Sequence, residues 1–244
     1  MRSTHFALSW LASLAACAAP YPDLERIAMP SRIPEHLLQF PGLEPREVPM
    51  FLNPDLADPA VGYRNSSGEA LFVEVRPAEE EELNFVLAHE YVHVALGPDW
   101  AALPYVVEEG LCDRFSAGIS TRAARDNRRR VLANLEWILL EHRDALPGDW
   151  AFWTRRELQN APDPNRVAAY TLGFVLAHEL PVERLRRLSL RALEAGLDVV
   201  PAAWWFDEWS GREARPSAGP GDRERALQML EAWRAAERER QPGQ

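Results

Sequence analysis

The chain of 244 residues contains only two cysteines, no lysine and no excess of positive charge. All of its 27 basic residues are arginines spread along the chain, and 37 acidic residues outnumber them to give a net charge of -10. An acidic chain of this kind is a poor candidate for a nucleic-acid-binding protein, because phosphate binding requires concentrated positive charge. The densest basic cluster, Arg128 to Arg130, is interpreted as the solvated face of a helix.

The chain does not open on a long hydrophobic segment, because the apolar run at residues 6–16 is too short to cross a bilayer as a helix. An arginine near the N-terminus and small residues before Cys17 give this run the layout of a secretory signal. The four residues LAAC, ending at Cys17, resemble the bacterial lipobox, in which the cysteine is lipidated and becomes the first residue. An ordinary signal cleaved after Ala16 or Ala19 is the alternative.

These features predict a signal peptide at residues 1–16, a proline-rich tether at residues 17–45 and a folded domain at residues 46–240. The protein is then expected to be an exported bacterial lipoprotein of the cell envelope, held to a membrane by the acyl chains on Cys17. Cys112 is then the only thiol not committed to lipid, so no internal disulfide can form. The sequence gives no indication of the oligomeric state.

Hydrophobic patterning predicts a small sheet followed by many helices. Alternation indicates strands at residues 46–54 and 69–77, and the stretch ALFVEV at residues 70–75 is expected to be an edge strand that can pair with an extended peptide. One helix is expected from Glu79 to Leu96, with an acidic first turn, and another starts near Pro104. Further helices are expected at residues 127–144, 149–159, 165–179, 182–196 and 223–239. The predicted class is α+β and mostly helical, with a small N-terminal sheet and a helical C-terminal lobe.

The segment LAHEYVHVALG, from Leu87 to Gly97, has two histidines four residues apart and a glutamate after the first. Residues four apart lie on one face of a helix, so His89 and His93 can direct two imidazole nitrogens to one point. Glu90 lies about 100° further round the helix and can act as a general base without binding the ion. The pattern favours zinc-dependent hydrolysis. The alternative is a pair of core histidines that are hydrogen-bonded to carbonyl groups.

Glu109, sixteen residues after His93, is the expected third ligand. Two antiparallel helices joined by a short loop can bring its carboxylate to the histidines and leave one position open for water. Asp113 shares a helix face with Glu109 and can accept the other ring N–H of a ligand histidine. Glu108 competes for the ligand role, but only Glu109 has an aspartate four residues later.

The order HExxH followed by E-x-x-x-D resembles the gluzincin metallopeptidases, and LPYVVEEGLCDRFSA is similar to a stretch of the peptidase-MA-like group. The resemblance extends over about residues 70–211 and is looser in AYTLGFVLAHELPVERL and WWFDEWSG. It implies a zincin-like catalytic domain with one Zn²⁺ ion. The residues that it assigns are the zinc ligands His89, His93 and Glu109, the general base Glu90 and the outer acceptor Asp113. Tyr105 and Cys112 depart from the group's pattern, in which a tryptophan and an alanine are usual.

Three further residues have two interpretations each. Tyr170 lies where related enzymes place a residue that stabilises the oxyanion, although it can equally be a packing tyrosine. Cys112 is interpreted as a buried small apolar residue rather than a reactive thiol. His178 stands in a second LAHE sequence, but it lacks a histidine four residues later and is interpreted as structural.

The sequence therefore predicts a lipid-anchored zinc metallopeptidase that acts on a peptide or protein substrate. An endopeptidase is favoured, since no G-x-M-E-N-like sequence, the amine-anchoring device of aminopeptidase-N-like enzymes, precedes the motif. The rival hypothesis is a lipid-anchored envelope scaffold that keeps a peptidase-like fold for binding alone.

Overall fold

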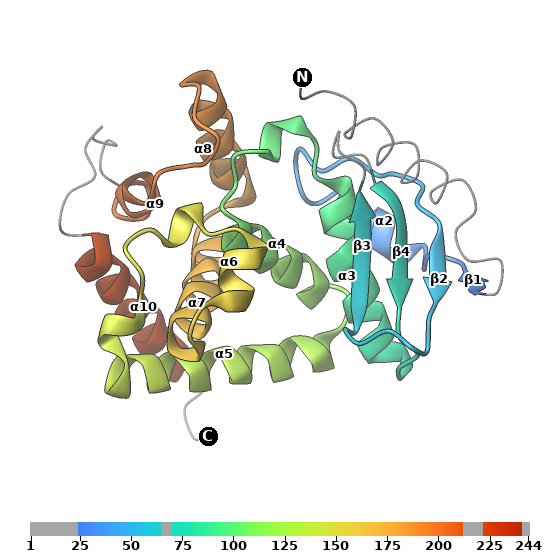
Figure 1. Cartoon of the computed structure of the whole chain (residues 1–244), viewed down its shortest axis with the longest axis horizontal. Helices are drawn as coiled ribbons and strands as arrows, with labels where there is room; N and C mark the ends of the chain where they lie inside the picture. The colour runs from blue at the N-terminus through green and yellow to red at the C-terminus, as the bar shows by residue number, and fades with distance from the viewer. Residues whose placement is uncertain (1–23, 65–69, 212–221, 241–244) are drawn as a thin grey trace, which may run out of the picture.

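The computed structural model describes residues 24–64, 70–211 and 222–240, so the predicted signal peptide and Cys17 lie outside the described residues. A four-stranded mixed sheet stands at one side of the molecule (Figure 1). Its strands are β1 (Glu25–Ile27), β2 (Met50–Leu52), β3 (Ala60–Arg64) and β4 (Ala70–Val75), in the order β1-β2-β4-β3. Strands β2 and β4 are parallel, whereas the β1–β2 and β3–β4 pairs are antiparallel.

The strand at residues 70–75 is confirmed as β4, but its expected position at the sheet edge is wrong. Strand β4 pairs with β2 on one side and with β3 on the other, and β3 lies at the end of the strand order. The sequence does not predict β3, because its residues AVGYR are few and include a glycine, which weakens a strand pattern. The edge that faces the helical part of the molecule is therefore β3.

Residues 25–43 are part of the packed structure, which differs from the extended tether expected there. Strand β1 pairs with β2, and residues within the predicted tether form helix α2 (Arg32–Leu37). Ile33 and Leu37 on α2 are fully buried. Further along, the backbone N–H of Arg46 donates a hydrogen bond to the Tyr91 hydroxyl at 3.0 Å. Burial of apolar side chains therefore holds much of this proline-rich segment against the core.

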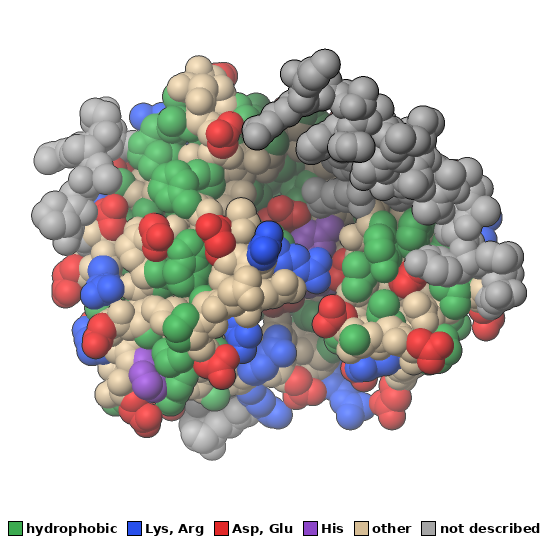
Figure 2. Space-filling view, in the orientation of Figure 1, with side chains coloured by type: hydrophobic (Ala, Val, Ile, Leu, Met, Phe, Trp, Pro, Cys, Tyr) green, Lys and Arg blue, Asp and Glu red, His purple; other side chains and the backbone are tan. Residues whose placement is uncertain are grey.

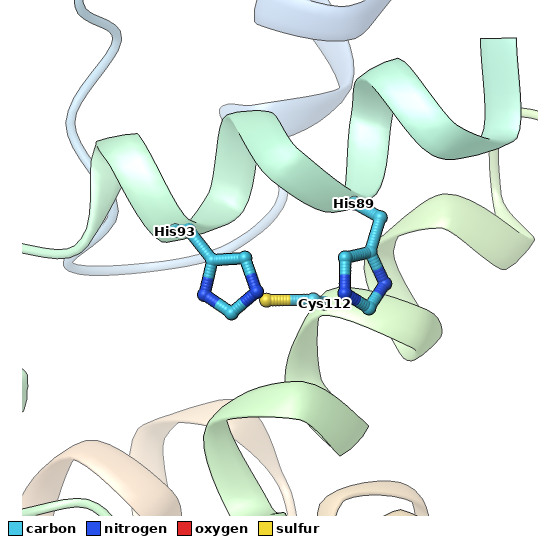
Figure 3. A group of neighbouring side chains, drawn as sticks. All are labelled: His89, His93 and Cys112. Carbon is cyan, nitrogen blue, oxygen red and sulfur yellow. The ribbon is translucent and has the colours of Figure 1, made fainter. Parts of the chain in front are cut away.

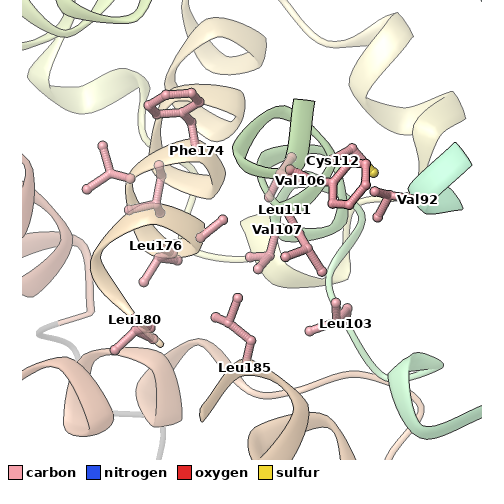
Figure 4. Packing of buried hydrophobic residues seen from close by; sticks show 14 of the residues in the cluster. Val92, Leu103, Val106, Val107, Leu111, Cys112, Phe174, Leu176, Leu180 and Leu185 are labelled. Atoms are coloured by element: carbon pink, nitrogen blue, oxygen red, sulfur yellow. The ribbon is translucent and has the colours of Figure 1, made fainter. Parts of the chain in front are cut away.

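Helix α3 (Glu80–Ala95) lies between the sheet and the remaining helices (Figure 1) and ends, as predicted, before Gly97 and Pro98. Helix α4 (Tyr105–Ala117) follows a short 3-10 turn and packs against both α3 and α7 (Asp163–Glu179). A Cβ atom on Gly110 would lie 2.5 Å from the carbonyl oxygen of Gly173, so these two helices approach each other backbone to backbone. Figure 4 shows buried apolar side chains of both helices, among them Leu111 of α4 and Leu176 of α7, in one packed cluster.

The other helices cover the far side of α4 and confirm the α+β, mostly helical class. They are α5 (Thr121–Glu141), α6 (Arg155–Asn160), α8 (Val182–Glu194), α9 (Ala202–Trp209) and α10 (Asp222–Arg240). The helix predicted at residues 149–159 is instead a 3-10 turn followed by α6, because Thr154 and Glu157 form a capping box that starts a new helix. Within the described part of the chain, no helix is long and apolar enough to cross a membrane.

Candidate metal centre

His89 and His93 project from one face of α3 toward α4 (Figure 3). Their ring centroids are 5.2 Å apart, and their side chains are 17% and 14% exposed. The rest of α3 is largely buried, as the apolar residues around the motif predict. The two imidazoles therefore meet in a partly enclosed space, where polar groups need partners.

The carboxylate of Glu109 faces both histidines. Its Oε2 atom lies 3.3 Å from Nε2 of His89, and its Oε1 atom lies 3.3 Å from Nε2 of His93. Two donors that bind one tetrahedral zinc ion at about 2.0–2.1 Å are themselves about 3.3 Å apart. Each of the two contacts has this spacing, and a different oxygen of Glu109 makes each one.

The opposite nitrogen of each imidazole contacts a different carboxylate. Nδ1 of His89 lies 3.0 Å from Oδ1 of Asp113, and Nδ1 of His93 lies 2.7 Å from Oε1 of Glu108. A carboxylate can only accept, so each Nδ1 carries a proton and donates it. In the neutral ring the lone pair of Nε2 then points toward Glu109, an arrangement that requires a cation or a second ring proton between the two groups.

The charges around the histidines shift their titration in the same sense. Burial by itself lowers the pKa of His89, but its hydrogen bonds to Asp113 and Glu109 outweigh burial and raise the pKa well above the ordinary value. The pKa of His93 is likewise raised, since Cys112, Glu108 and Glu109 together outweigh burial. Burial favours a higher pKa for Glu109, yet hydrogen bonds from both histidines hold it well below the usual range. The centre is therefore a cluster in which the imidazoles and the carboxylates stabilise each other's charged forms.

Glu108 has a part that its sequence position does not reveal. The sequence presents Glu108 as a competing ligand. In the structure its carboxylate instead accepts a hydrogen bond from Nδ1 of His93, just as Asp113 accepts one from Nδ1 of His89. Asp113 is held in turn by Asn127 of α5, whose Nδ2 donates to Oδ2 of Asp113 at 2.8 Å. The expected contact of Asp113 with a histidine of the motif is present.

Cys112 is fully buried, as expected, but its sulfur lies beside the imidazoles (Figure 3). Donor atoms of His89, His93 and Cys112 all lie within 4.8 Å of one another, so these three residues form a group that could hold a metal ion. Cys112 stands three residues after Glu109 on α4 and shares its helix face, which is the sequence signal for this placement. Without a metal ion, burial raises the pKa of the Cys112 thiol, against the opposing influence of the histidines.

Comparisons with family models, curated proteins and solved structures gave no match to this chain. The residues and their geometry are therefore the basis for any functional statement.

The carboxylate of Glu90 lies beside strand β3 of the sheet. A Cβ atom on Gly62 would lie 3.0 Å from Oε2 of Glu90, so the missing side chain of Gly62 leaves space for this carboxylate beside β3. Glu90 is thus placed between the histidine helix and the edge strand. A group there can reach a substrate that lies along β3.

Tyr170 lies on α7 and lines a cavity of about 400 Å³ together with His89 and Glu109. Its ring is 6.4 Å from that of Tyr105, centroid to centroid. Burial and the charge of Glu109 raise the pKa of both tyrosines, so both hydroxyls are protonated hydrogen-bond donors at neutral pH. The sequence names Tyr105 only as a departure from a tryptophan, whereas the structure places it beside Glu109 as a second hydroxyl.

His178 takes no part in this centre. Its Nδ1 donates to the carbonyl oxygen of Phe174 at 2.8 Å, and its ring stacks on that of Phe174 with centroids 3.8 Å apart. Burial lowers the pKa of His178 to about 4. It is a neutral structural histidine, which agrees with its lack of a second histidine one turn later.

Proposed function

We propose that the protein is a zinc-dependent peptidase, because the carboxylate of Glu109 faces the Nε2 atoms of both motif histidines. His89, His93 and Glu109 would hold the ion, and their donor types are those of a catalytic zinc site with one open position. A zinc ion held there supplies Lewis acidity, which polarises a peptide carbonyl and makes water easier to deprotonate. Asp113 and Glu108 fix the two imidazole rings through their Nδ1 protons.

Glu90 is the proposed general base. It takes a proton from the attacking water and then delivers that proton to the leaving amine, so the carboxylate is restored at the end of the cycle. Tyr170 or Tyr105 is placed to donate a hydrogen bond to the oxyanion that forms, since both hydroxyls are protonated and lie near Glu109.

The edge strand β3 is the proposed support for an extended substrate. Among the described residues, β3 has a strand partner on only one side, so its other edge offers backbone N–H and C=O groups to a peptide. Gly62 of this strand lies close to Glu90, so the face of β3 adjoins the proposed general base. This assigns to β3 the part that the sequence assigns to residues 70–75.

A metal assay combined with a peptide digestion tests the proposal. The purified mature protein is analysed for bound metal by atomic emission and is then incubated with a peptide library whose fragments are identified by mass spectrometry. Zinc at one ion per chain together with cleavage supports a peptidase. A protein that cleaves no peptide when fully loaded with zinc contradicts it.

The position of Cys112 supports a second candidate, a metal-stabilised scaffold without turnover. If its sulfur joins His89, His93 and Glu109, four protein ligands surround the ion and no position remains for water, which is the arrangement of structural zinc sites. Such a protein binds zinc and cleaves nothing. The catalytic hypothesis is preferred because the motif keeps a glutamate, Glu90, directly after the first histidine, which a purely structural site does not need.

Export as a lipoprotein is also proposed, on the LAAC sequence that ends at Cys17. Mass spectrometry of the N-terminal peptide from membranes of expressing bacteria tests it: acylated Cys17 is expected, and in the Cys17→Ala variant the protein should leave the membrane fraction. A mature N-terminus after Ala19 would instead show an ordinary signal.

A further inference from the structure

A cavity of about 400 Å³ adjoins the metal centre on the side formed by α5 and α7. His89 and Glu109 line one wall, and Tyr170 lines another. Its volume is in the range of small-molecule binding sites. Figure 2 shows the surface hollowed near a histidine, with basic side chains gathered along the rim of the hollow.

Two arginines line this cavity, Arg130 from α5 and Arg166 from α7. Between them and around them are the amide groups of Asn127 and Asn134 and the apolar side chain of Val131. Two guanidinium groups and two amides provide many N–H donors in one place, and guanidinium groups bind carboxylates with paired hydrogen bonds. The carboxylates of Glu109 and Asp113 also line the cavity, but both contact His89 of the metal centre, whereas the two guanidinium groups project from α5 and α7.

Arg130 uses only part of its N–H donors in contacts among the described residues. Its Nη2 atom donates a hydrogen bond to Oδ1 of Asn127 at 2.6 Å. Within the described residues Arg130 forms no ion pair. It also borders a second cavity, which the acidic residues Glu79, Glu81 and Glu82 line. Asn127 connects it through Asp113 to His89. The neighbouring arginines of the same cluster differ, because Arg128 binds Glu237 and Arg129 lies 3.5 Å from Asp126. Only part of this cluster is therefore the solvated face expected from the sequence.

Arg166 is also only partly engaged. It pairs with Asp163 one turn earlier on α7, but the two side chains are 40% and 75% exposed, so the ion pair is weak. Its remaining donors can bind a ligand in the cavity.

We propose that the cavity bordered by Arg130 and Arg166 binds a carboxylate of the peptide substrate, which makes these two arginines specificity-determining residues. The proposal rests on the peptidase function, since it places the bound carboxylate beside His89 and Glu109. Both a side chain of aspartate or glutamate and the C-terminal carboxylate of a peptide carry the required group, and the experiment distinguishes them.

Capture of peptides by the immobilised Glu90→Gln protein tests the proposal without turnover. Three N-acetylated hexapeptide libraries are compared: one with a fixed internal glutamate and an amidated C-terminus, one with glutamine and an amidated C-terminus, and one with glutamine and a free C-terminal carboxylate. Quantitative mass spectrometry measures the bound fraction of each. We expect one of the two carboxylate libraries to be captured preferentially, and the preferred library identifies the source of the group.

Variants then assign the preference to the two arginines. Arg130→Gln and Arg166→Gln are each expected to reduce capture of the preferred library roughly three- to tenfold, the range for a partly exposed charge-assisted contact. Arg129→Gln is the matched control, because it removes the same charge from the adjacent residue of α5, which does not line the cavity. Equal capture of all three libraries, or an equal effect of Arg129→Gln, overturns the proposal.

The two proposals fail in different ways. If carboxylate preference depends on Arg130 but the zinc-loaded wild-type protein cleaves no library, the binding site stands and the peptidase function fails. If the wild-type protein cleaves peptides without any carboxylate preference, the peptidase function stands and the binding site fails.

Discussion

Oδ1 of Asp113 lies 3.0 Å from Nδ1 of His89, on the opposite side of the imidazole ring from Glu109. The contact fixes the ring so that Nε2 faces the Glu109 carboxylate. It therefore couples a residue that does not touch the proposed ion to the strength with which the ion is held.

Replacement of Asp113 by alanine is expected to weaken metal binding without removing a ligand. The loss should be roughly 10- to 100-fold in affinity, as for other groups that orient a ligand histidine. Competition with a chromophoric chelator measures it. Asp126→Ala, which removes an exposed carboxylate from α5, is the control. An affinity unchanged by Asp113→Ala contradicts the role assigned to this contact.

The Glu90→Gln variant separates metal binding from turnover. We expect its zinc content to match that of the wild type, because Glu90 lies beside Gly62 and is not one of the proposed ligands, while cleavage falls by about 10²- to 10⁴-fold with the loss of the base. Glu82→Gln changes an exposed glutamate of the same helix and should retain full cleavage. Undiminished cleavage by the Glu90→Gln protein would contradict the proposed mechanism.

The Cys112→Ala variant decides between an open and a closed metal site. If Cys112 is only a packing residue, the variant keeps its zinc and its cleavage and loses about 1 kcal/mol in the free energy of unfolding from the small cavity. If the sulfur binds the ion, zinc affinity should fall by more than about 100-fold. Chelator competition and chemical denaturation measure the two quantities on one sample.

The contact between α4 and α7 should control the position of Glu109. Replacement of Gly110 by alanine places a methyl group against the carbonyl of Gly173, and we expect it to lower the free energy of unfolding by about 1–3 kcal/mol and to weaken zinc binding. Gly148→Ala is the matched control, since a Cβ atom there meets no neighbour within 4 Å. Thermal denaturation with and without zinc reports both effects. A Gly110→Ala protein as stable as the control would show that the helices do not need this contact.

The buried His178 predicts a dependence of stability on pH that is separate from the metal centre. Its folded pKa of about 4 lies below the ordinary value of 6.5, so the unfolded chain binds the extra proton first as the pH falls. The stability that it contributes is present in full above pH 6.5 and is lost as the pH falls toward 4.

Removal of this histidine should flatten that dependence. Between pH 6.5 and 4, His178→Gln is expected to lose less free energy of unfolding than the wild type, by about 1–2 kcal/mol. His142→Gln, which removes a histidine at the end of α5, is the control. Urea denaturation at several pH values gives the comparison, and identical slopes for the wild type and His178→Gln would contradict the assignment.

Local sequence patterns predicted those helices and strands whose ends are set by residues close to them in the chain. The acidic first turn and the Gly97–Pro98 stop predict the bounds of α3 to within one residue, because caps act over a single turn. Strand β3 and the packing of α2 escaped prediction, since both depend on partners far away in the chain. A short strand with a glycine has no pattern of its own until β4 lies beside it.

The candidate site divides in the same way. Helical spacing by itself determined that His89 and His93 share a face, and that Glu109 and Asp113 share another, because 3.6 residues per turn is a property of the backbone. Only the tertiary structure decided that Glu109 faces both Nε2 atoms, that Glu108 takes Nδ1 of His93, and that Arg130 lines the adjoining cavity. These contacts follow from the close approach of α4 to α7 and from the packing of α5 beside them, which no single helix encodes.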